Sequence, residues 1–436
     1  MNSMTMLPAT TSDERARVDG LRSVLDLTPE PHSVAQTGLA SHVLVDLAAK
    51  TMYYRGRATD SDLSDWLGLS RAVVAEVADG MRREGLLETL SQAGPLQYRY
   101  ALTSAGHQRA VEAFQRDGYV GPAPVPYEDY LEIQSRQSVK ALEITPETVR
   151  HALAHLVQPP PLVSDVAAGV LSAGALLLYG ASGNGKSTIA EAIRQMLLAP
   201  MVVPYAIDIG GRTMRLFDAR VHEAHPDADL VSFDRRFAIV QRPLVTLGTE
   251  LALSDLEMGY VESDRTYVAP PQVKANGGVL VIDDLGRQLV RPVELLNRWM
   301  APMASGMDQL SVRGGELLRF PFDVVLVFAT NLEPRDLGDE AFLRRIRHKV
   351  AVPDPTHEEF VEIFHREADR LGIPFNEQPV ERILAFYYDG QSRPMRGSHP
   401  GDLLQNVIDF AKVEGGHPEL SVESLSRACD AYFVHS

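Results

Sequence analysis

Near the start of the chain, apolar residues recur at helical spacing in three stretches, at residues 38–48, 60–67 and 70–84. Two runs of alternating character, residues 86–90 and 98–102, follow on either side of a turn sequence at Gln92–Pro95. We therefore predict three helices and a β-hairpin, which together form a small α+β domain over residues 36–120. Residues 1–35 have no comparable pattern, and we expect a flexible tail there.

The pattern changes after the proline-rich stretch Gly121–Pro126, which predicts a linker over residues 121–142. From residue 143 to about 355, short apolar runs, one of them at residues 201–209, alternate with helical segments, as is typical of a mostly parallel sheet. Four amphipathic stretches without strands follow, at residues 356–371, 380–388, 402–414 and 422–433. We predict an α/β domain over residues 143–355 and a helical subdomain over residues 356–436.

A glycine-rich segment, Gly180–Thr188, directly follows the apolar run Ala175–Tyr179 and matches the pattern G-x-x-x-x-G-K-S/T. Glycines let backbone N–H groups turn toward phosphates, and the start of the following helix adds partial positive charge. We expect Lys186 to reach the β and γ oxygens of a bound ATP and Ser187 to offer its hydroxyl to Mg²⁺. The residues of this expected ATP site are Gly180, Ser182, Gly183, Asn184, Gly185, Lys186, Ser187 and Thr188.

A second apolar strand, residues 279–282, ends in Asp283 and Asp284. The carboxyl ends of parallel strands form the usual ligand crevice of an open α/β sheet. We expect Asp283 to belong to the Mg²⁺ shell and Asp284 to orient or deprotonate a water molecule. Phosphoryl transfer needs such groups because its catalysis is mostly positioning and charge neutralisation.

A third apolar strand, residues 323–328, runs into Thr330 and Asn331, and an arginine-bearing segment, Ala341–Arg347, follows. With the helical C-terminal stretches, these motifs resemble the AAA+ ATPase family from about residue 143 to the end of the chain. The approach to Asp283 is loosely similar to the MoxR branch. The resemblance implies a P-loop AAA+ module with a helical lid, and an enzyme that hydrolyses ATP with Mg²⁺.

The same resemblance assigns roles to the remaining motif residues. It implies that Asn331, with Thr330 as second choice, senses the γ-phosphate. It places an arginine finger at Arg345, with Arg344 as second choice, and a finger supplied in trans makes hydrolysis depend on a neighbouring subunit. A ring or helical oligomer, with a hexamer as the expected size, follows from this assignment.

Two positions depart from the family pattern. Asp284 stands where the family most often has glutamate, and Gly401 stands where a sensing arginine is expected in the lid, although Arg396 lies just upstream. A protein that binds ATP and hydrolyses it slowly or not at all, as an ATP-dependent switch or scaffold, is therefore an alternative to an active ATPase.

The domain at residues 36–120 resembles a winged helix, which binds either protein or DNA. Its candidate recognition helix carries Arg71 and Arg82–Arg83, but also Glu76 and Asp79, and this is a poor face for a DNA groove. The net charge of −16 also argues against coating of nucleic acid by charge alone. We favour an ATPase that remodels or organises an unidentified partner protein, with a DNA-associated ATPase as the alternative.

The composition limits the cellular compartments in which the protein is expected. Cys429 is the single cysteine, so an internal disulfide and a cysteine-based zinc site are excluded, as suits a reducing compartment. The chain has no apolar run of the roughly 18 residues that a membrane span requires. We expect a cytoplasmic protein that is not inserted in a membrane.

Overall fold

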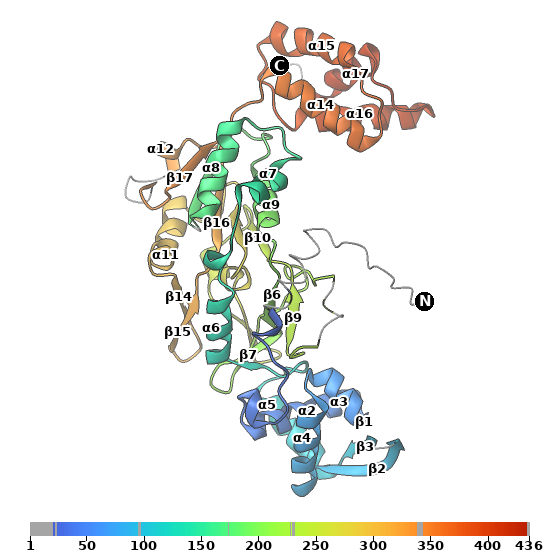
Figure 1. Cartoon of the computed structure of the whole chain (residues 1–436), viewed down its shortest axis with the longest axis vertical. Helices are drawn as coiled ribbons and strands as arrows, with labels where there is room; N and C mark the ends of the chain where they lie inside the picture. The colour runs from blue at the N-terminus through green and yellow to red at the C-terminus, as the bar shows by residue number, and fades with distance from the viewer. Residues whose placement is uncertain are drawn as a thin grey trace, which may run out of the picture.

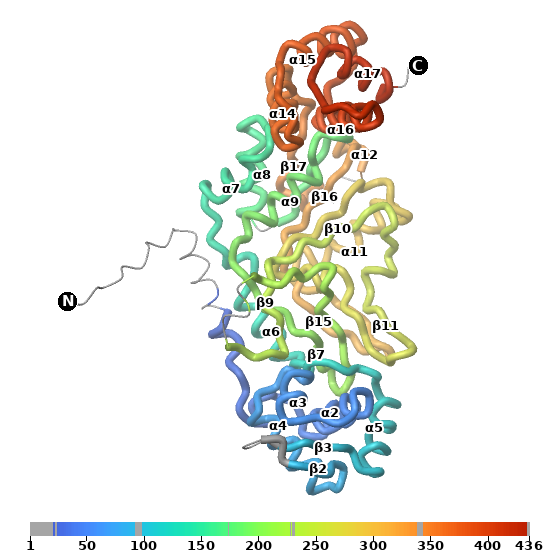
Figure 2. The backbone as a smooth tube through the Cα atoms, turned by 90° about the vertical axis from the view of Figure 1, so that its right-hand side faces the viewer, coloured from blue at the N-terminus to red at the C-terminus, as the bar shows by residue number. Residues whose placement is uncertain are grey.

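The computed structural model describes residues 21, 24–94, 97–172, 174–226, 228, 232–337 and 343–433. Three regions are stacked along the long axis of the molecule (Figure 1). An α+β module, blue in the figure, lies at one end, a helical region in red at the other, and the larger sheets between them, as a view turned by 90° also shows (Figure 2). Residues 1–20 of the expected tail lie outside the described residues.

The N-terminal module contains the three predicted helices followed by the predicted hairpin, and a further helix, α5, closes it. Its three strands pair in the order β1-β3-β2. Thr59 caps α3 in a capping box with Asp62, and Ser70 accepts a hydrogen bond from the Val73 N–H at the start of α4. The elements are η1 (Ala35–Thr37), α2 (Ser41–Arg55), β1 (Ala58–Thr59), α3 (Asp60–Leu67), α4 (Arg71–Arg83), β2 (Leu87–Gly94), β3 (Gln97–Leu102) and α5 (Ser104–Arg116).

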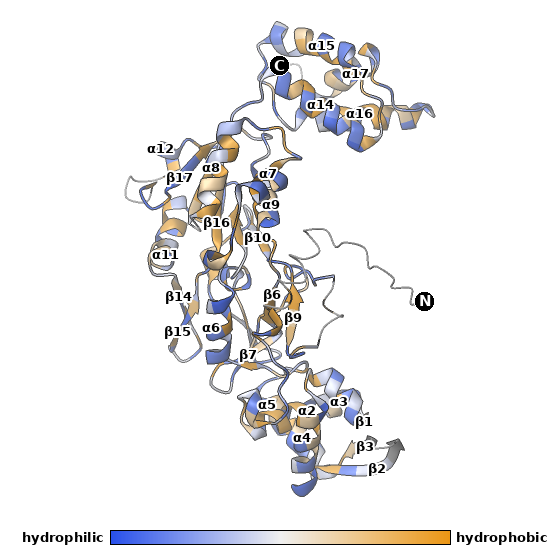
Figure 3. Cartoon of the chain, viewed as in Figure 1, coloured by the Kyte–Doolittle hydropathy of each residue, from blue (hydrophilic) through white to orange (hydrophobic). Residues whose placement is uncertain are grey.

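The central sheet has five parallel strands in the order β10-β13-β16-β5-β17. Its inner strands β13, β16 and β5 are buried and almost wholly apolar, orange in Figure 3, because both faces are covered, whereas the edge strand β17 buries only Val350. Alternate residues of each strand pack in two separate cores, so Leu176 and Leu178 face α7, α8 and α9 whereas Leu177 faces α11. The elements are α7 (Pro146–Leu153), α8 (Pro160–Leu171), β5 (Ala175–Tyr179), α9 (Lys186–Met196), β10 (Leu244–Leu247), β13 (Val279–Ile282), α11 (Pro292–Ser305), β16 (Val325–Thr330), α12 (Pro334–Leu337) and β17 (His348–Ala351).

A second, mixed sheet separates the central sheet from the N-terminal module, and its strand order is β11-β12-β8-β7-β4. The stretch 201–209, expected as one strand, is divided between β6, which pairs with β9, and β7 of the mixed sheet. The elements are β4 (Val125–Pro126), α6 (Tyr127–Arg136), η2 (Val139–Ala141), β6 (Met201–Pro204), β7 (Ala206–Asp208), β8 (Thr213–Arg215), β9 (Phe237–Val240), η4 (Leu253–Leu256), β11 (Gly259–Val261), β12 (Thr266–Val268), α10 (Pro271–Lys274), β14 (Met307–Ser311) and β15 (Leu317–Pro321).

Segments expected as a linker and as part of a flexible tail are packed in the structure. Residues 121–142, expected as a linker, contain β4, which pairs with β7, and α6, whose Tyr130 is buried. Residues 24–35, expected within the tail, place Val24 in a core with Val202. Both segments are held by partners distant in sequence, which local composition does not reveal.

The N-terminal module is fixed to the mixed-sheet region by two consecutive arginines. Arg235 donates to Ser64 Oγ in α3 at 2.6 Å and to the Leu69 carbonyl in the turn between α3 and α4 at 3.1 Å. Arg236 is 4% exposed, pairs with Asp234 and donates to the Thr37 carbonyl at 2.8 Å. The α3–α4 turn is therefore part of an internal contact.

The C-terminal region is helical, as predicted, and forms its own core around Phe360, Phe364 and Leu404. This region and the parallel sheet confirm the predicted α/β fold class. Among the described residues, no helix combines the length and the apolar character needed to cross a membrane. The elements are α14 (His357–Leu371), α15 (Glu377–Ile383), a π-helical turn η5 (Leu384–Tyr388), η6 (Asp389–Gln391), α16 (His399–Glu414) and α17 (Val422–Tyr432).

Candidate functional site

The glycine-rich loop leaves β5 at the carboxyl edge of the central sheet and ends at Lys186, the first residue of α9. Gly180 has φ of +142°, and a Cβ there would lie 2.3 Å from the Val352 carbonyl oxygen. Gly183 and Gly185 have φ of +85° and +83°, which a residue with a side chain adopts only under strain. The loop therefore needs its glycines, and it leads into a helix start whose N–H groups have no partner within the helix.

Lys186, at the end of the loop, is 7% exposed. Its Nζ donates to the carbonyl oxygens of Gly180 and Ala181 at 3.0 and 2.9 Å and to Asn331 Oδ1 at 2.8 Å. Burial lowers the pKa of Lys186, and the nearby Asp283 and Asp284 oppose that shift. The ammonium group is held where the loop backbone and the end of β16 meet.

The two aspartates after β13 contact different residues beside the phosphate loop. Ser187 Oγ donates to Asp283 Oδ2 at 2.9 Å, so the hydroxyl and the carboxylate expected to share Mg²⁺ are adjacent. Asp284 has φ of 50°, a left-handed conformation that directs its carboxylate toward Asn331 Nδ2 at 3.5 Å. A residue held in this region is a frequent mark of a functional site.

Strand order explains why Asn331 joins this group. β16 lies between β5 and β13, so the end of β16 is placed between the loop and the aspartates. Thr330 is fully buried, and its hydroxyl donates to the Leu285 carbonyl at 2.7 Å. This hydrogen bond holds the segment that follows β13. Of the two residues considered for γ-phosphate sensing, Asn331 is the one that contacts Lys186 and Asp284.

The donor set suits Mg²⁺ bound together with phosphate. In the described part of the chain, no cluster of three or more histidine, cysteine or acidic residues is arranged to hold a metal by itself. Ser187 and Asp283 offer two oxygen ligands side by side, and Mg²⁺ in phosphoryl-transfer sites is bound by few protein oxygens and by substrate phosphates. The remaining loop residues fit this picture: Ser182 is exposed, and Thr188 is half-buried in the first turn of α9.

Asn184 connects the loop to the helical region, a role that the sequence pattern did not reveal. Its side chain is 3% exposed, donates to Asp354 Oδ1 at 2.7 Å and accepts the Gly397 N–H at 3.2 Å. Arg396 forms an ion pair with the same Asp354 carboxylate. Gly401 stands at the position where the family resemblance implies an arginine. It lies beside Glu367, whose Oε2 is 3.6 Å from the position that a Cβ on Gly401 would take.

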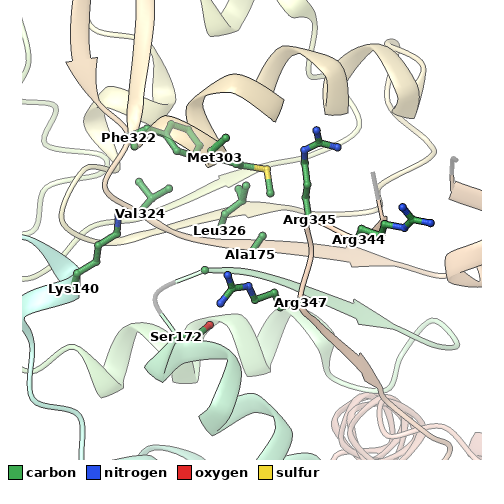
Figure 4. A pocket seen from close by; sticks show the side chains of 13 residues that line it. Lys140, Ser172, Ala175, Met303, Phe322, Val324, Leu326, Arg344, Arg345 and Arg347 are labelled. Atoms are coloured by element: carbon green, nitrogen blue, oxygen red, sulfur yellow. The ribbon is translucent and has the colours of Figure 1, made fainter. Parts of the chain in front are cut away.

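The predicted finger arginines lie at the other edge of the sheet. Arg344 and Arg345 precede β17 and line a pocket of about 500 Å³ at the amino ends of β5 and β16 (Figure 4). The five residues of β5 span about 16 Å between this edge and the loop. Ala341 and Phe342 of the same segment lie outside the described residues. Neither arginine is near the loop of its own chain.

Comparisons with known proteins cover parts of the chain. A family model described as "Domain of unknown function (DUF8689)" matches residues 356–431, nearly the whole helical region. A search of curated proteins gave no match.

Among solved structures, the chain is similar to NtrX from Brucella abortus in complex with ATP, with a TM-score of 0.37 and 14% identity over 76% of this chain and 65% of that one. It is also similar to the RuvB Holliday junction branch migration motor of Thermotoga maritima, with a TM-score of 0.36 and 14% identity over 66% of this chain and 70% of that one. The chain spans 65% and 66% of the lengths of the two NtrX structures that it matches.

Proposed function

We propose that the protein is an ATPase of the AAA+ type, which binds ATP on the Gly180–Thr188 loop and hydrolyses it where subunits meet. The observation that carries the proposal is the convergence of Lys186, Asp284 and Asn331 at the carboxyl edge of the sheet. Hydrogen bonds link Lys186 to Asn331 and Asn331 to Asp284. These are the residue types needed to hold a triphosphate and to position a water beside it.

Each residue has a defined task in this proposal. Lys186 leaves its carbonyl partners to bind the β and γ oxygens, and loop N–H groups bind the other phosphate oxygens. Asn331 holds the attacking water with Asp284, which accepts a proton as the bond from the γ-phosphorus to the bridging oxygen breaks and ADP and phosphate are formed. Ser187 and Asp283 would hold Mg²⁺, which would supply neutralisation of the charge on the phosphate oxygens.

The placement of Arg345 supports hydrolysis between subunits. It lies at the sheet edge opposite the loop of its own chain, so it can serve the loop of another copy and not its own. A contact between unlike edges is heterologous, and repeated contacts of this kind form a ring or a helical filament. We propose such an oligomer, with a hexamer as the expected ring.

The test is steady-state ATP hydrolysis per subunit, measured over a range of protein concentrations. Turnover per subunit should rise with concentration and reach a plateau as the oligomer forms. Lys186→Ala should abolish ATP binding, whereas Lys412→Ala, on the exposed face of α16, should leave it unchanged. A constant rate per subunit across concentrations would show that sites are completed within one chain.

A slow switch is a second candidate, and one observation favours it. Asp284 is one methylene shorter than glutamate, and its Oδ1 lies 3.5 Å from Asn331 Nδ2, a weak contact. Such a site would bind ATP and turn it over slowly. Tight ATP binding with negligible turnover at every protein concentration would favour the switch over the motor.

A DNA-associated role is disfavoured by how the N-terminal module is held. In winged helices that read DNA, the start of the recognition helix enters the groove. Here Arg235 covers the turn before α4, and Glu30 and Asp65 line the same hollow as Arg71. We therefore propose a partner protein as the client, and duplex binding at low salt that is lost on changing Arg71, Arg82 and Arg83 to Ala would overturn this preference.

A further inference from the structure

The turn that follows β13 contains a residue in an unfavourable backbone conformation. In the described part of the chain, three residues other than glycine have a left-handed φ, and Asp284 is the one at the carboxyl edge of the central sheet. A left-handed residue with a side chain costs conformational energy, and it persists only where its surroundings enforce it. The structure must therefore contain groups that hold Asp284 in this conformation.

One side of this turn is held by the neighbouring strand β16. The Leu285 N–H donates to the Ala329 carbonyl at 2.8 Å, and the Thr330 hydroxyl donates to the Leu285 carbonyl at 2.7 Å. The Leu285 side chain is 1% exposed and belongs to the core on the α11 face of the sheet. These contacts fix the residue that follows Asp284.

Gln288 holds the other side of the turn. Its Nε2 donates to the Asp283 carbonyl at 2.7 Å, and its Oε1 accepts the Gly286 N–H at 2.9 Å. The amide therefore spans the turn from the residue before Asp284 to the residue two positions after it. A single glutamine satisfies both backbone groups because its amide is at once a donor and an acceptor, whereas leucine is neither and an ionised glutamate only accepts.

The conformation of this turn decides where the Asp284 carboxylate lies. A strand that continued past Asp283 would point the next side chain to the opposite face of the sheet. Because Asp284 is left-handed, the chain leaves the strand direction there, and its Oδ1 lies 3.5 Å from Asn331 Nδ2. The carboxylate of Asp283 instead accepts a hydrogen bond from Ser187 Oγ. The turn thus keeps two adjacent carboxylates in different contacts.

We propose that Gln288 is a positioning residue for Asp284: it keeps the turn left-handed and so holds the Asp284 carboxylate where it meets the attacking water. The proposal rests on the ATPase function proposed above and deepens it, since it names a residue that acts through the base. The turn also accounts for an aspartate at this position. Aspartate adopts a left-handed φ more readily than glutamate does, so the shorter acid fits this backbone at lower cost.

Kinetics of full-length variants test the role of Gln288. Gln288→Leu removes both hydrogen bonds at similar side-chain size, so kcat should fall about 10- to 100-fold while the Kd for ATP stays within about twofold. Gln288→Glu still accepts the Gly286 N–H but cannot donate to the Asp283 carbonyl, and kcat should fall by a similar factor. Gln309→Leu, at an exposed position of β14, is the control. Wild-type kcat in both Gln288 variants would overturn the proposal.

A double variant separates action through Asp284 from an independent effect of Gln288. If Gln288 acts by placing the Asp284 carboxylate, Gln288→Leu should change kcat by about twofold or less in a protein that already carries Asp284→Asn. A general structural loss would lower kcat by the same factor in both backgrounds. Equal factors in single-turnover hydrolysis would therefore contradict the positioning role.

Thermal unfolding tests the turn without any ATP hydrolysis. Asp284→Gly and Asp284→Ala both remove the carboxylate, but only glycine accepts a left-handed φ without strain. With Gln288 present, the glycine variant should therefore unfold about 2–4 °C above the alanine variant. With Gln288→Leu this difference should vanish or reverse, because a turn that can relax to a negative φ favours alanine. The same difference in both backgrounds would show that Gln288 does not hold the turn.

The two kinds of measurement separate failure of this proposal from failure of the proposed function. If the wild-type protein binds ATP but does not hydrolyse it, the ATPase function fails, and the thermal comparison still decides whether Gln288 holds the turn. If the protein hydrolyses ATP and the Gln288 variants behave as the Gln309→Leu control does, only the positioning role fails.

Discussion

The side-chain amide of Asn184 donates a hydrogen bond of 2.7 Å to Asp354 Oδ1 and so ties the phosphate loop to the segment that enters the helical region. Ser398 N–H donates to the Gly183 carbonyl at 2.7 Å and adds a second tie. Movement of the helical region is therefore coupled to the shape of the loop. The carboxylate of Asp354 also holds Arg396, a cation close enough to Lys186 to lower its pKa.

We expect Asp354→Asn to tighten ATP binding by about three- to tenfold. The amide keeps an acceptor for Asn184 but no longer holds Arg396 by charge, so the guanidinium is released toward the phosphates. Arg396→Ala should weaken binding instead. Calorimetric titration with ATP at two salt concentrations measures both effects, and Asp409→Asn, on the exposed side of α16, is the control. Equal affinities for all these proteins would show that Arg396 does not reach the nucleotide.

Asp284→Asn should lower kcat about 100-fold while the Kd for ATP stays within about twofold. The amide keeps the size of the side chain but cannot accept the proton of the attacking water. Asn331→Ala should also lower kcat, since it removes the group that links Lys186 to Asp284. Single-turnover hydrolysis with radiolabelled ATP separates the chemical step from product release. A change confined to ATP affinity would remove Asp284 from the chemistry.

Gly68→Ala should disturb the contact between the N-terminal module and the mixed sheet. Gly68 has φ of +62°, and a Cβ there would lie 2.5 Å from the Arg235 carbonyl oxygen. Gly85→Ala is a matched control, since Gly85 has φ of +70° but a Cβ there meets nothing within 4 Å. The control should lose about 1–2 kcal/mol of stability from backbone strain alone, and Gly68→Ala about 1–3 kcal/mol more from the clash. Chemical denaturation compares the two, and equal losses would place the α3–α4 turn outside the contact.

The helical region should lose stability as pH falls from about 6.5 toward about 4. Burial lowers the pKa of His399 to about 4, so over this range the unfolded chain binds a proton that the folded chain does not. The free energy of unfolding therefore decreases with falling pH, by about 1–2 kcal/mol when the partial solvation of the ring is allowed for. His399→Gln should flatten this part of the profile, as followed by thermal unfolding at several pH values. An unchanged slope would assign the dependence to other groups.

The grouping of residues at the carboxyl edge of the central sheet followed from the sequence pattern, whereas the roles of these residues stay predictions. Lys186, Asp283 and Asn331 each follow a short apolar run, and parallel strands bring such positions together whatever the details of the connections. The hydrogen bonds among them needed the structure, because they depend on β16 lying between β5 and β13.

Contacts between distant segments were not predictable from local pattern. Gly121–Pro126 has the composition of a linker, yet β4 within it pairs with β7 about 80 residues later. Lys140 and Arg347 are far apart in the chain and line the same pocket, which Lys140 reaches because η2 lies beside the end of α11. The strands of the mixed sheet are three or so residues long, too short for a period of two to stand out.

The loop and the pocket that Arg344 and Arg345 line are at opposite edges of the central sheet, and this has a consequence for counting active sites. In an open row of subunits joined edge to edge, the terminal copy always presents a loop that nothing completes. Closing the row into a ring completes this last loop, so that every copy is then competent. The fraction of active sites in a preparation would then report how many of its assemblies are closed.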